Sequence, residues 1–328
     1  MIMVNIQNVL TGQIYDITNQ MTDFEITLER QAVAGKLSGT FYNTNHIYIP
    51  KGSIIMVNVD GVNFFKGYFF DHDVDRWSKT RIVFYDQLKY LMKNKASKYF
   101  NPNFYIEDLF EYFKTKFNLK FGERDTVSID LGYKLFENQT LMDMVTYALQ
   151  QLLEKTGKIY NFYDYYGFLR LKEAKNMMVS IKLVNGSTIL DYRVKGTIDE
   201  DTYNVIAYKY TSADVEQEAT EYPEGGMPTK NAHFGKLQLF EVRDPKSTKA
   251  SMEEIAKDLY ENHNREKIVL LIEALGDPQV RAGSVVFCDV GTVDGVKTTG
   301  YHLIDKITHK FSNKKHTMSL TTYELNNN

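Results

Sequence analysis

The sequence predicts a β-rich α+β protein in which two similar small antiparallel β-barrels are separated by an α+β domain. Three observations carry this prediction: a high content of Tyr and Phe, alternating hydrophobic patterns toward both ends of the chain, and a change to helical spacing in the middle. The chain has 328 residues, with 23 Tyr and 20 Phe beside 1 Trp and 6 Pro. Aromatic residues suit half-buried pleated surfaces, so their abundance favours strands and interfaces.

Residues 1–95 are predicted to form the first β-barrel domain. From Asp23, the apolar residues Phe24, Ile26 and Leu28 alternate with polar ones, which is the period of a strand with one wet face. Asp60-Gly61 separates two apolar runs and is the clearest hairpin signal, because both residues tolerate positive φ. Further strands are expected at residues 37–42, 54–59, 64–70 and 81–85.

Residues 96–190 are predicted to form a separate α+β domain. Helical spacing links the apolar residues of one segment, Ile106, Leu109, Phe110, Phe113 and Phe117. Thr140 can cap a second helix, because Asp143 completes a Thr-x-x-Asp capping box. A hairpin is expected where residues 158–163 and 168–171 alternate around a turn at residues 164–167.

Residues 191–328 are predicted to form the second β-barrel domain. Its strands are expected at residues 203–210, 268–274, 284–290, 300–310 and 316–324. Residues 213–228 contain Asp and Glu but no Lys or Arg, and Gly225-Gly226 interrupts them, so an exposed acidic loop or a protruding ribbon is expected there. A helix is expected over about residues 247–264.

An internal repeat links the two ends of the chain. The matching pairs are Gly52-Ser53-Ile54 with Gly283-Ser284-Val285, Asp60-Gly61 with Asp294-Gly295, and Gly67-Tyr68 with Gly300-Tyr301. The repeat predicts that the strands of both ends superimpose in the same order, with Gly52 over Gly283 and Gly67 over Gly300. The alternative is that antiparallel strands with Asp-Gly turns look alike without being repeats.

Composition and charge exclude several classes of protein. A net charge of −3 and a pI near 6.2 give no global basic field, so no specific nucleic-acid partner is expected. The single cysteine, Cys288, allows neither an intramolecular disulfide nor a Cys-based zinc site, and its apolar surroundings predict a core residue. No apolar run approaches the ~20 residues of a membrane span, and no secretory pattern begins the chain. We therefore expect a protein made in the cytoplasm and not inserted in a membrane.

The sequence predicts no catalytic, cofactor-binding or metal-binding residue, and no cofactor. Phosphate-binding glycine loops, a GxSxG nucleophile elbow and HExxH are all absent from the sequence. Asp71-His72-Asp73 could form a metal corner, but in a strand His72 faces away from the two carboxylates. His302, His309 and His316 recur every seven residues across turns, an interval that need not bring them together.

Two further patterns have a functional and a simpler interpretation. The carboxylates Glu107/Asp108 and Asp199/Glu200/Asp201 could serve glycoside hydrolysis, although solvated surface is the simpler interpretation. Four lysines interleave with aromatic residues and could contact nucleic acid, but a solvated helix face explains them more simply. These lysines are Lys89, Lys93, Lys95 and Lys98.

A series of short motifs recurs in a recognisable order along the chain, at residues 52–55, 64–68, 85–91, 138–141, 163–169, 276–278, 281–285, 300–304 and 317–320. The order of these motifs resembles that in the tail hub proteins of contractile phages. It is most similar to the XkdQ/YqbQ family, the hubs of defective prophages and phage-tail-like bacteriocins, and also to the late control protein D of phages. The motifs are loose and none is catalytic. Some family members carry a fused cell-wall hydrolase, and we expect none here because the chain ends at Asn328.

The resemblance implies a homotrimeric baseplate hub, made in the host cytoplasm and assembled into the virion or tail-like particle. Its implied partners are the central spike protein, the hexameric tail tube or tube-initiator protein, and other baseplate proteins. Two like barrels in each of three chains give six similar units, so a threefold object could dock a sixfold ring. The alternatives are a cell-wall-degrading, lysozyme-like tail enzyme and a receptor-binding tail module.

Overall fold

A computed structural model describes the chain except for residues 22, 31–32, 44–46, 77–78, 200–201, 210–219, 243–248, 294, 314 and 326–328. The described residues divide into two compact units. The first comprises Met1–Arg193 with Leu270–Asn328, and the second comprises Val194–Val269. The predicted β-rich α+β class is confirmed, since strands outnumber helices in the described chain.

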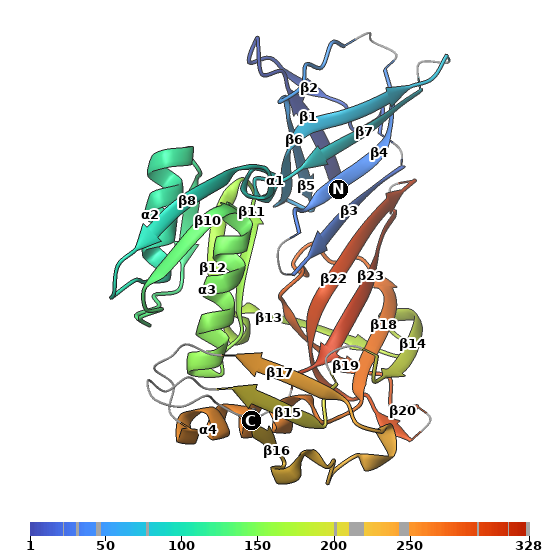
Figure 1. Cartoon of the computed structure of the whole chain (residues 1–328). Helices are drawn as coiled ribbons and strands as arrows, with labels where there is room; N and C mark the ends of the chain where they lie inside the picture. The colour runs from blue at the N-terminus through green and yellow to red at the C-terminus, as the bar shows by residue number, and fades with distance from the viewer. Residues whose placement is uncertain are drawn as a thin grey trace. The chain divides into compact units, whose positions relative to one another are not determined.

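A 13-stranded sheet forms the framework of the first unit, and Figure 1 shows its strands. The main strand order is β14-β18-β23-β22-β3-β4-β7-β6-β5-β1-β2, with β19 paired to both β22 and β13. The strands are β1 (Ile2–Gln7), β2 (Ile14–Asp16), β3 (Asp23–Glu29), β4 (Lys36–Tyr42), β5 (Ile54–Val59), β6 (Val62–Val74), β7 (Lys79–Tyr85), β13 (Met178–Val184), β14 (Ile189–Thr197), β18 (Lys267–Leu275), β19 (Val285–Asp289), β22 (Gly300–Ser312) and β23 (Lys315–Glu324). Two short strands, β20 (Thr292–Val293) and β21 (Val296–Lys297), pair separately.

Alternation along the strands places one set of side chains in the core. On β3, Phe24, Ile26 and Leu28 are buried, as their period of two predicts. The hairpin expected at Asp60-Gly61 joins β5 to β6, and both residues have positive φ, 51° and 82°. A turn of two residues with positive φ matches the twist of the strands that it connects.

The two ends of the chain repeat one strand order. The N-terminal half reads β1-β5-β6-β7-β4-β3, and the C-terminal half reads β13-β19-β22-β23-β18-β14. Corresponding strands also follow the same order along the sequence. One difference is that β1 lies antiparallel to β5, whereas β13 lies parallel to β19. The predicted repeat of strand order is therefore confirmed.

Backbone hydrogen bonds fix the register of this repeat. Gly52 and Gly283 have φ of 85° and 84°. Gly52 N donates to Phe69 O at 2.9 Å, and Gly283 N donates to Ile304 O at 2.8 Å. Each glycine thus begins the same bend into a strand, and the predicted match of Gly52 with Gly283 is confirmed.

The predicted match of Gly67 with Gly300 is wrong by two residues. Gly67 pairs with Ile55 on β5, and the residue that holds this place on β22 is His302, which pairs with Val286. The connection from β19 to β22 is longer than the two-residue turn from β5 to β6, so the glycines near the turns do not keep their spacing. Asp294, the repeat's second Asp, lies outside the described residues.

The prediction of two closed barrels is not confirmed, because the described strands form an open sheet. β22 pairs with β3 from Lys306↔Glu29 to Ser312↔Asp23, so the two halves merge. Figure 1 shows these strands side by side although they lie at opposite ends of the sequence. A strand's hydrophobic period reports which face is buried but not which neighbour lies along its edge. The sequence therefore could not predict this junction.

Alanine at the two matching glycines should separate backbone strain from crowding. Both positions have φ that non-glycine residues adopt at a cost of about 1 kcal/mol. A Cβ on Gly52 meets nothing within 4 Å, whereas one on Gly283 lies 2.8 Å from Asn161 Cγ. We expect Gly283→Ala to lower the urea midpoint of unfolding more than Gly52→Ala. Equal midpoints would contradict the contact with Asn161.

Helices α1 (Leu88–Lys93), α2 (Ile106–Phe117) and α3 (Leu141–Thr156) share an aromatic-rich core with two small sheets in the first unit. The capping box predicted at Thr140 is confirmed, because Asp143 N donates to Thr140 Oγ1 and Thr140 N donates to Asp143 Oδ2, each at 3.0 Å. Phe110 of α2 stacks on Phe162 with ring centroids 5.4 Å apart. The sheets contain β8 (Lys95–Phe100), β9 (Phe121–Arg124), β10 (Lys134–Thr140), β11 (Tyr160–Tyr165) and β12 (Phe168–Glu173).

The second unit has a core of its own. Helix α4 spans Lys249–His263, which agrees with the helix expected over 247–264 as far as residues are described. It packs Met252, Ala256 and Tyr260 against Ile206 and Tyr208. The strands of this unit are β15 (Val205–Lys209), β16 (Thr220–Tyr222) and β17 (Gln238–Val242).

The acidic segment predicted over 213–228 is described only from residue 220 onward. Residues 213–219 lie outside the described chain. Residues 220–222 form β16 and pair antiparallel with β15, so this part is a strand, as in the ribbon alternative, and not a loop. Glu221 accepts a hydrogen bond from Lys236 Nζ at 2.8 Å, which gives one acidic residue a cationic partner within the second unit.

Candidate assembly site

One face of the large sheet is polar across the junction of the two halves. Opposite it, Ile26, Ile307 and Leu320 are buried. Thr27 and Thr308 hydrogen-bond across the junction, with 3.1 Å between their Oγ1 atoms. The residues of this polar face are Glu25, Thr27 and Glu29 on β3, Lys36, Ser38 and Thr40 on β4, Lys306, Thr308 and Lys310 on β22, and Thr317, Ser319 and Thr321 on β23.

A groove of about 290 Å³ lies on the C-terminal part of this face. Strands β14, β18, β22 and β23 all contribute to it. Its charged residues are Asp191, Arg193, Glu273 and Lys306, and hydroxyl groups come from Thr308, Ser319 and Thr321. Apolar atoms, including those of Leu271, Ile272 and Leu320, also line the groove. Small-molecule sites are usually enclosed, whereas this groove lies open on the face of the sheet and mixes apolar, charged and hydroxyl groups, as protein contact surfaces do.

A buried charge cluster lies where α1, β11 and the start of the C-terminal half meet. Asp86 and Asp164 are 4% and 6% exposed. Asp86 accepts hydrogen bonds from the backbone N–H groups of Gly35 at 2.9 Å and Leu88 at 3.0 Å. Arg281 donates to the carbonyl oxygen of Asp164 at 2.8 Å. The cluster thus joins segments that lie far apart in the sequence.

The environment of this cluster disfavours negative charge. Burial raises the pKa of Asp86 well above its usual value, and the nearby Asp164 raises it further. Burial also raises the pKa of Asp164 to about 6, although hydrogen bonding from Gly167 and the charge of Arg281 oppose the rise. Two carboxyl groups with raised pKa values beside a cation are a feature of many active sites.

The cavity beside this cluster is too small for a substrate. Its volume is about 20 Å³, which is about the space of one water molecule. Most polar atoms of the cluster are used in bonds to the backbone, such as those from Gly35 and Leu88 to Asp86. The geometry therefore supports a structural role, in which the cluster fixes how the connected segments pack.

Two of the three regularly spaced histidines meet in the core. His309 Nδ1 lies 2.9 Å from His316 Nε2, and His309 Nε2 lies 3.0 Å from the carbonyl oxygen of Val280. Because that carbonyl requires a donor, His309 Nδ1 accepts the hydrogen bond from His316. Burial lowers the pKa of His309 to about 3 and that of His316 to about 4. His302 lies apart from this pair and contacts the carbonyl oxygen of Thr298.

The remaining sequence candidates have structural partners. His72 Nδ1 lies 2.7 Å from Lys51 Nζ, and Asp71 accepts a hydrogen bond from the backbone of His72. Within the described residues, no group of three or more His, Cys, Asp or Glu side chains is placed to hold a metal ion. Cys288 is buried as predicted, and burial raises the pKa of its thiol to about 12.

The carboxylates proposed as candidates for glycoside hydrolysis have different structural partners. Glu107 forms an ion pair with Arg124 at 3.3 Å, whereas Asp108 accepts a hydrogen bond from Tyr105 N at the start of α2. Of the second group, Asp199 is described, and residues 200–201 lie outside the described chain. Among the four lysines that could contact nucleic acid, Lys89 places its Nζ atom 4.2 Å from the centre of the Tyr85 ring.

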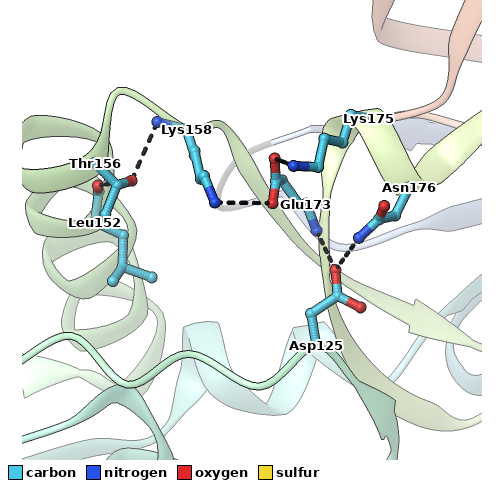
Figure 2. A network of polar contacts seen from close by, with 7 residues as sticks. All are labelled: Asp125, Leu152, Thr156, Lys158, Glu173, Lys175 and Asn176. Carbon is cyan, nitrogen blue, oxygen red and sulfur yellow. Dashed lines mark hydrogen bonds and ion pairs between the residues drawn. The ribbon is translucent and has the colours of Figure 1, made fainter.

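A polar network, drawn in Figure 2, surrounds Glu173 at the C-terminal end of β12. Glu173 pairs with Lys175 at 2.9 Å and with Lys158 at 3.6 Å. Asp125 accepts hydrogen bonds from Glu173 N at 2.8 Å and Asn176 Nδ2 at 2.9 Å. These carboxylates form ion pairs with lysines and hydrogen bonds with backbone and amide groups, which is the arrangement of residues that stabilise the fold.

Comparison with known proteins assigns the chain to a family. The family model described as YQBQ-like matches residues 24–323. The chain belongs to the YQBQ-like family. This YQBQ-like chain is 25% identical over 280 residues to YqbQ of Bacillus subtilis (strain 168), covering 85% of the chain and 83% of the relative. It is 24% identical over 302 residues to the phage-like element PBSX protein XkdQ of the same organism, covering 92% and 88%.

Solved structures share the fold of this YQBQ-like chain. The 43 kDa tail protein of prophage MuSo2 from Shewanella oneidensis has a TM-score of 0.71 at 15% identity, with 98% of each chain covered. A chain of the Francisella PdpA-VgrG complex has a TM-score of 0.60 at 13% identity, covering all of this chain and 58% of that one. None of the described helices is both long and apolar enough to cross a membrane.

Proposed function

We propose that this protein is the baseplate hub of a contractile tail or phage-tail-like particle, a homotrimer that joins a central spike to the hexameric tail tube. The observation that carries the proposal is the repeat of one strand order in the two halves of the sheet. Three chains with two like halves each present six similar units to a sixfold ring. Membership of the YQBQ-like family supports the same assignment.

The proposal includes the finer organisation of the chain. Residues 1–95 and 191–328 supply the two like β domains, the second of them together with β13 and the start of β14 at residues 178–190, and the preceding residues from 96 onward form the α+β domain between them. We propose that the sheets approach closed barrels only when neighbouring copies complete them. The partners are the spike, the tube or tube-initiator protein and other baseplate proteins, and assembly takes place in the host cytoplasm.

The hub acts by positioning its partners and carries out no catalytic step. The buried cluster of Asp86 and Asp164 opens into a cavity of only about 20 Å³, which supports a structural rather than a hydrolytic role. Purified chain should therefore release no product from bacterial cell walls. Lysis that is abolished by Asp164→Asn would favour the cell-wall-degrading alternative.

The mass and symmetry of the assembled complex test the hub proposal. We expect the chain, co-expressed with the spike protein of its own particle, to form a complex with three copies per spike. Light scattering gives the mass, and electron microscopy gives the symmetry and the position of the chain. A copy number other than three, or a position at the baseplate periphery, would overturn the proposal.

A further inference from the structure

The junction between the two halves offers a template for contact between copies. β22 pairs first with β19 and then, beyond its bulge at Asp305, with β3 along the same edge. β6 is the counterpart of β22, and its bulge lies at Phe70. Beyond this bulge, residues 71–74 pair with β7 on one side only, among the described residues. The place that β3 fills beside β22 is therefore open beside β6.

The matching open edge is on β14, the counterpart of β3. β14 ends the strand order, with β18 on one side and no strand on the other among the described residues. The sequences of the two strands also match, since Asp23-Phe24-Glu25 on β3 resembles Asp191-Tyr192-Arg193 on β14. One chain thus carries both halves of a second junction, but at separate edges.

On both open edges, an aspartate side chain hydrogen-bonds a backbone N–H group of the edge strand. His72 N donates to Asp71 Oδ1 at 2.9 Å, and Tyr192 N donates to Asp191 Oδ1 at 2.8 Å. In each case an aspartate occupies a backbone donor of an edge strand. Charged side chains on strand edges oppose unplanned pairing in solution. Such edges remain available for a partner that presents a better-placed strand.

We propose that residues 71–74 of β6 in one copy pair antiparallel with β14 of a second copy, repeating the β22–β3 junction. Counting from the bulges, Asp73 corresponds to Thr308, and Lys195 corresponds to Thr27 from the sequence match of β14 with β3. Because Thr308 pairs with Thr27, Asp73 of one copy lies opposite Lys195 of the next. Asp73 and Lys195 are both exposed and of opposite charge, which favours this pairing. The inference rests on the proposed trimer.

A disulfide between copies tests the junction. The full chain is fused through a flexible linker to a trimeric coiled coil, which holds three copies at about millimolar effective concentration. With Asp73→Cys and Lys195→Cys together, oxidation should give a covalent trimer at about five times or more the yield of the control, because the paired strands place the two thiols within bonding distance. The control combines Asp73→Cys with Glu111→Cys, an exposed position on α2.

The outcomes separate this inference from the hub proposal. No covalent trimer above the control, in a fusion that keeps the circular dichroism spectrum of the wild type, would overturn the junction. If the co-expressed complex still contains three copies per spike, the hub proposal stands without it. In that complex, Asp73→Lys should weaken assembly, and Asp73→Lys with Lys195→Asp should restore it. Failure of this charge exchange to restore assembly would also count against the junction.

Discussion

Asp86→Ala should lower the free energy of unfolding by about 3 kcal/mol, because it leaves two buried backbone donors without an acceptor. Those donors are the N–H groups of Gly35 and Leu88, whose hydrogen bonds Asp86 accepts at 2.9 and 3.0 Å. Relief of repulsion with Asp164 offsets part of the loss. The two unpaired donors still dominate, since each costs about 1–3 kcal/mol when buried. Urea unfolding at neutral pH measures the difference.

Asp108→Ala is the matched control for this prediction. Asp108 also accepts a backbone hydrogen bond, from Tyr105 N at 2.8 Å, but at an exposed helix start. Its loss should cost about 1 kcal/mol. If Asp86→Ala costs no more than Asp108→Ala, the buried cluster does not hold the connected segments together.

His309→Gln should change how stability depends on pH between about pH 6 and pH 4. The folded-state pKa values of His309 and His316 are about 3 and about 4, below the unfolded value near 6.5. The unfolded chain therefore binds more protons in this range, and these histidines make the protein less stable as the pH falls. Gln keeps one donor and one acceptor but does not titrate.

The buried carboxyl groups act in the opposite direction. The pKa of Asp164 is raised to about 6 and that of Asp86 is raised well above its usual value. The folded chain therefore binds more protons than the unfolded chain over the same range, and stability from these groups rises as the pH falls. The two effects partly cancel in the wild type, so the variant is compared with it at each pH.

The difference in unfolding free energy between His309→Gln and the wild type should shift in favour of the variant by about 1.4 kcal/mol per pH unit on acidification. Urea midpoints at several pH values between 6 and 4 measure this shift. His233→Gln is the control, because His233 is exposed. A constant difference across the range would show that His309 takes up a proton in the folded protein as readily as in the unfolded chain.

The sequence determined the faces of the strands, the hairpin at Asp60-Gly61 and the capping box at Thr140. Each depends on residues close together in the chain: alternation assigns a face, positive φ selects Gly and Asp, and a cap joins positions three apart. The repeat of Gly52 by Gly283 was also visible, because a glycine is needed wherever the same bend recurs.

Only the tertiary structure decided how distant segments meet. The pairing of β22 with β3 joins residues about as far apart as the chain allows, and a strand's pattern does not name its neighbour. The same holds for the meeting of Asp86, Asp164 and Arg281, and for the contact of His309 with His316 across a turn. Edges, buried charges and junctions arise from packing between segments, and packing is what a local pattern leaves open.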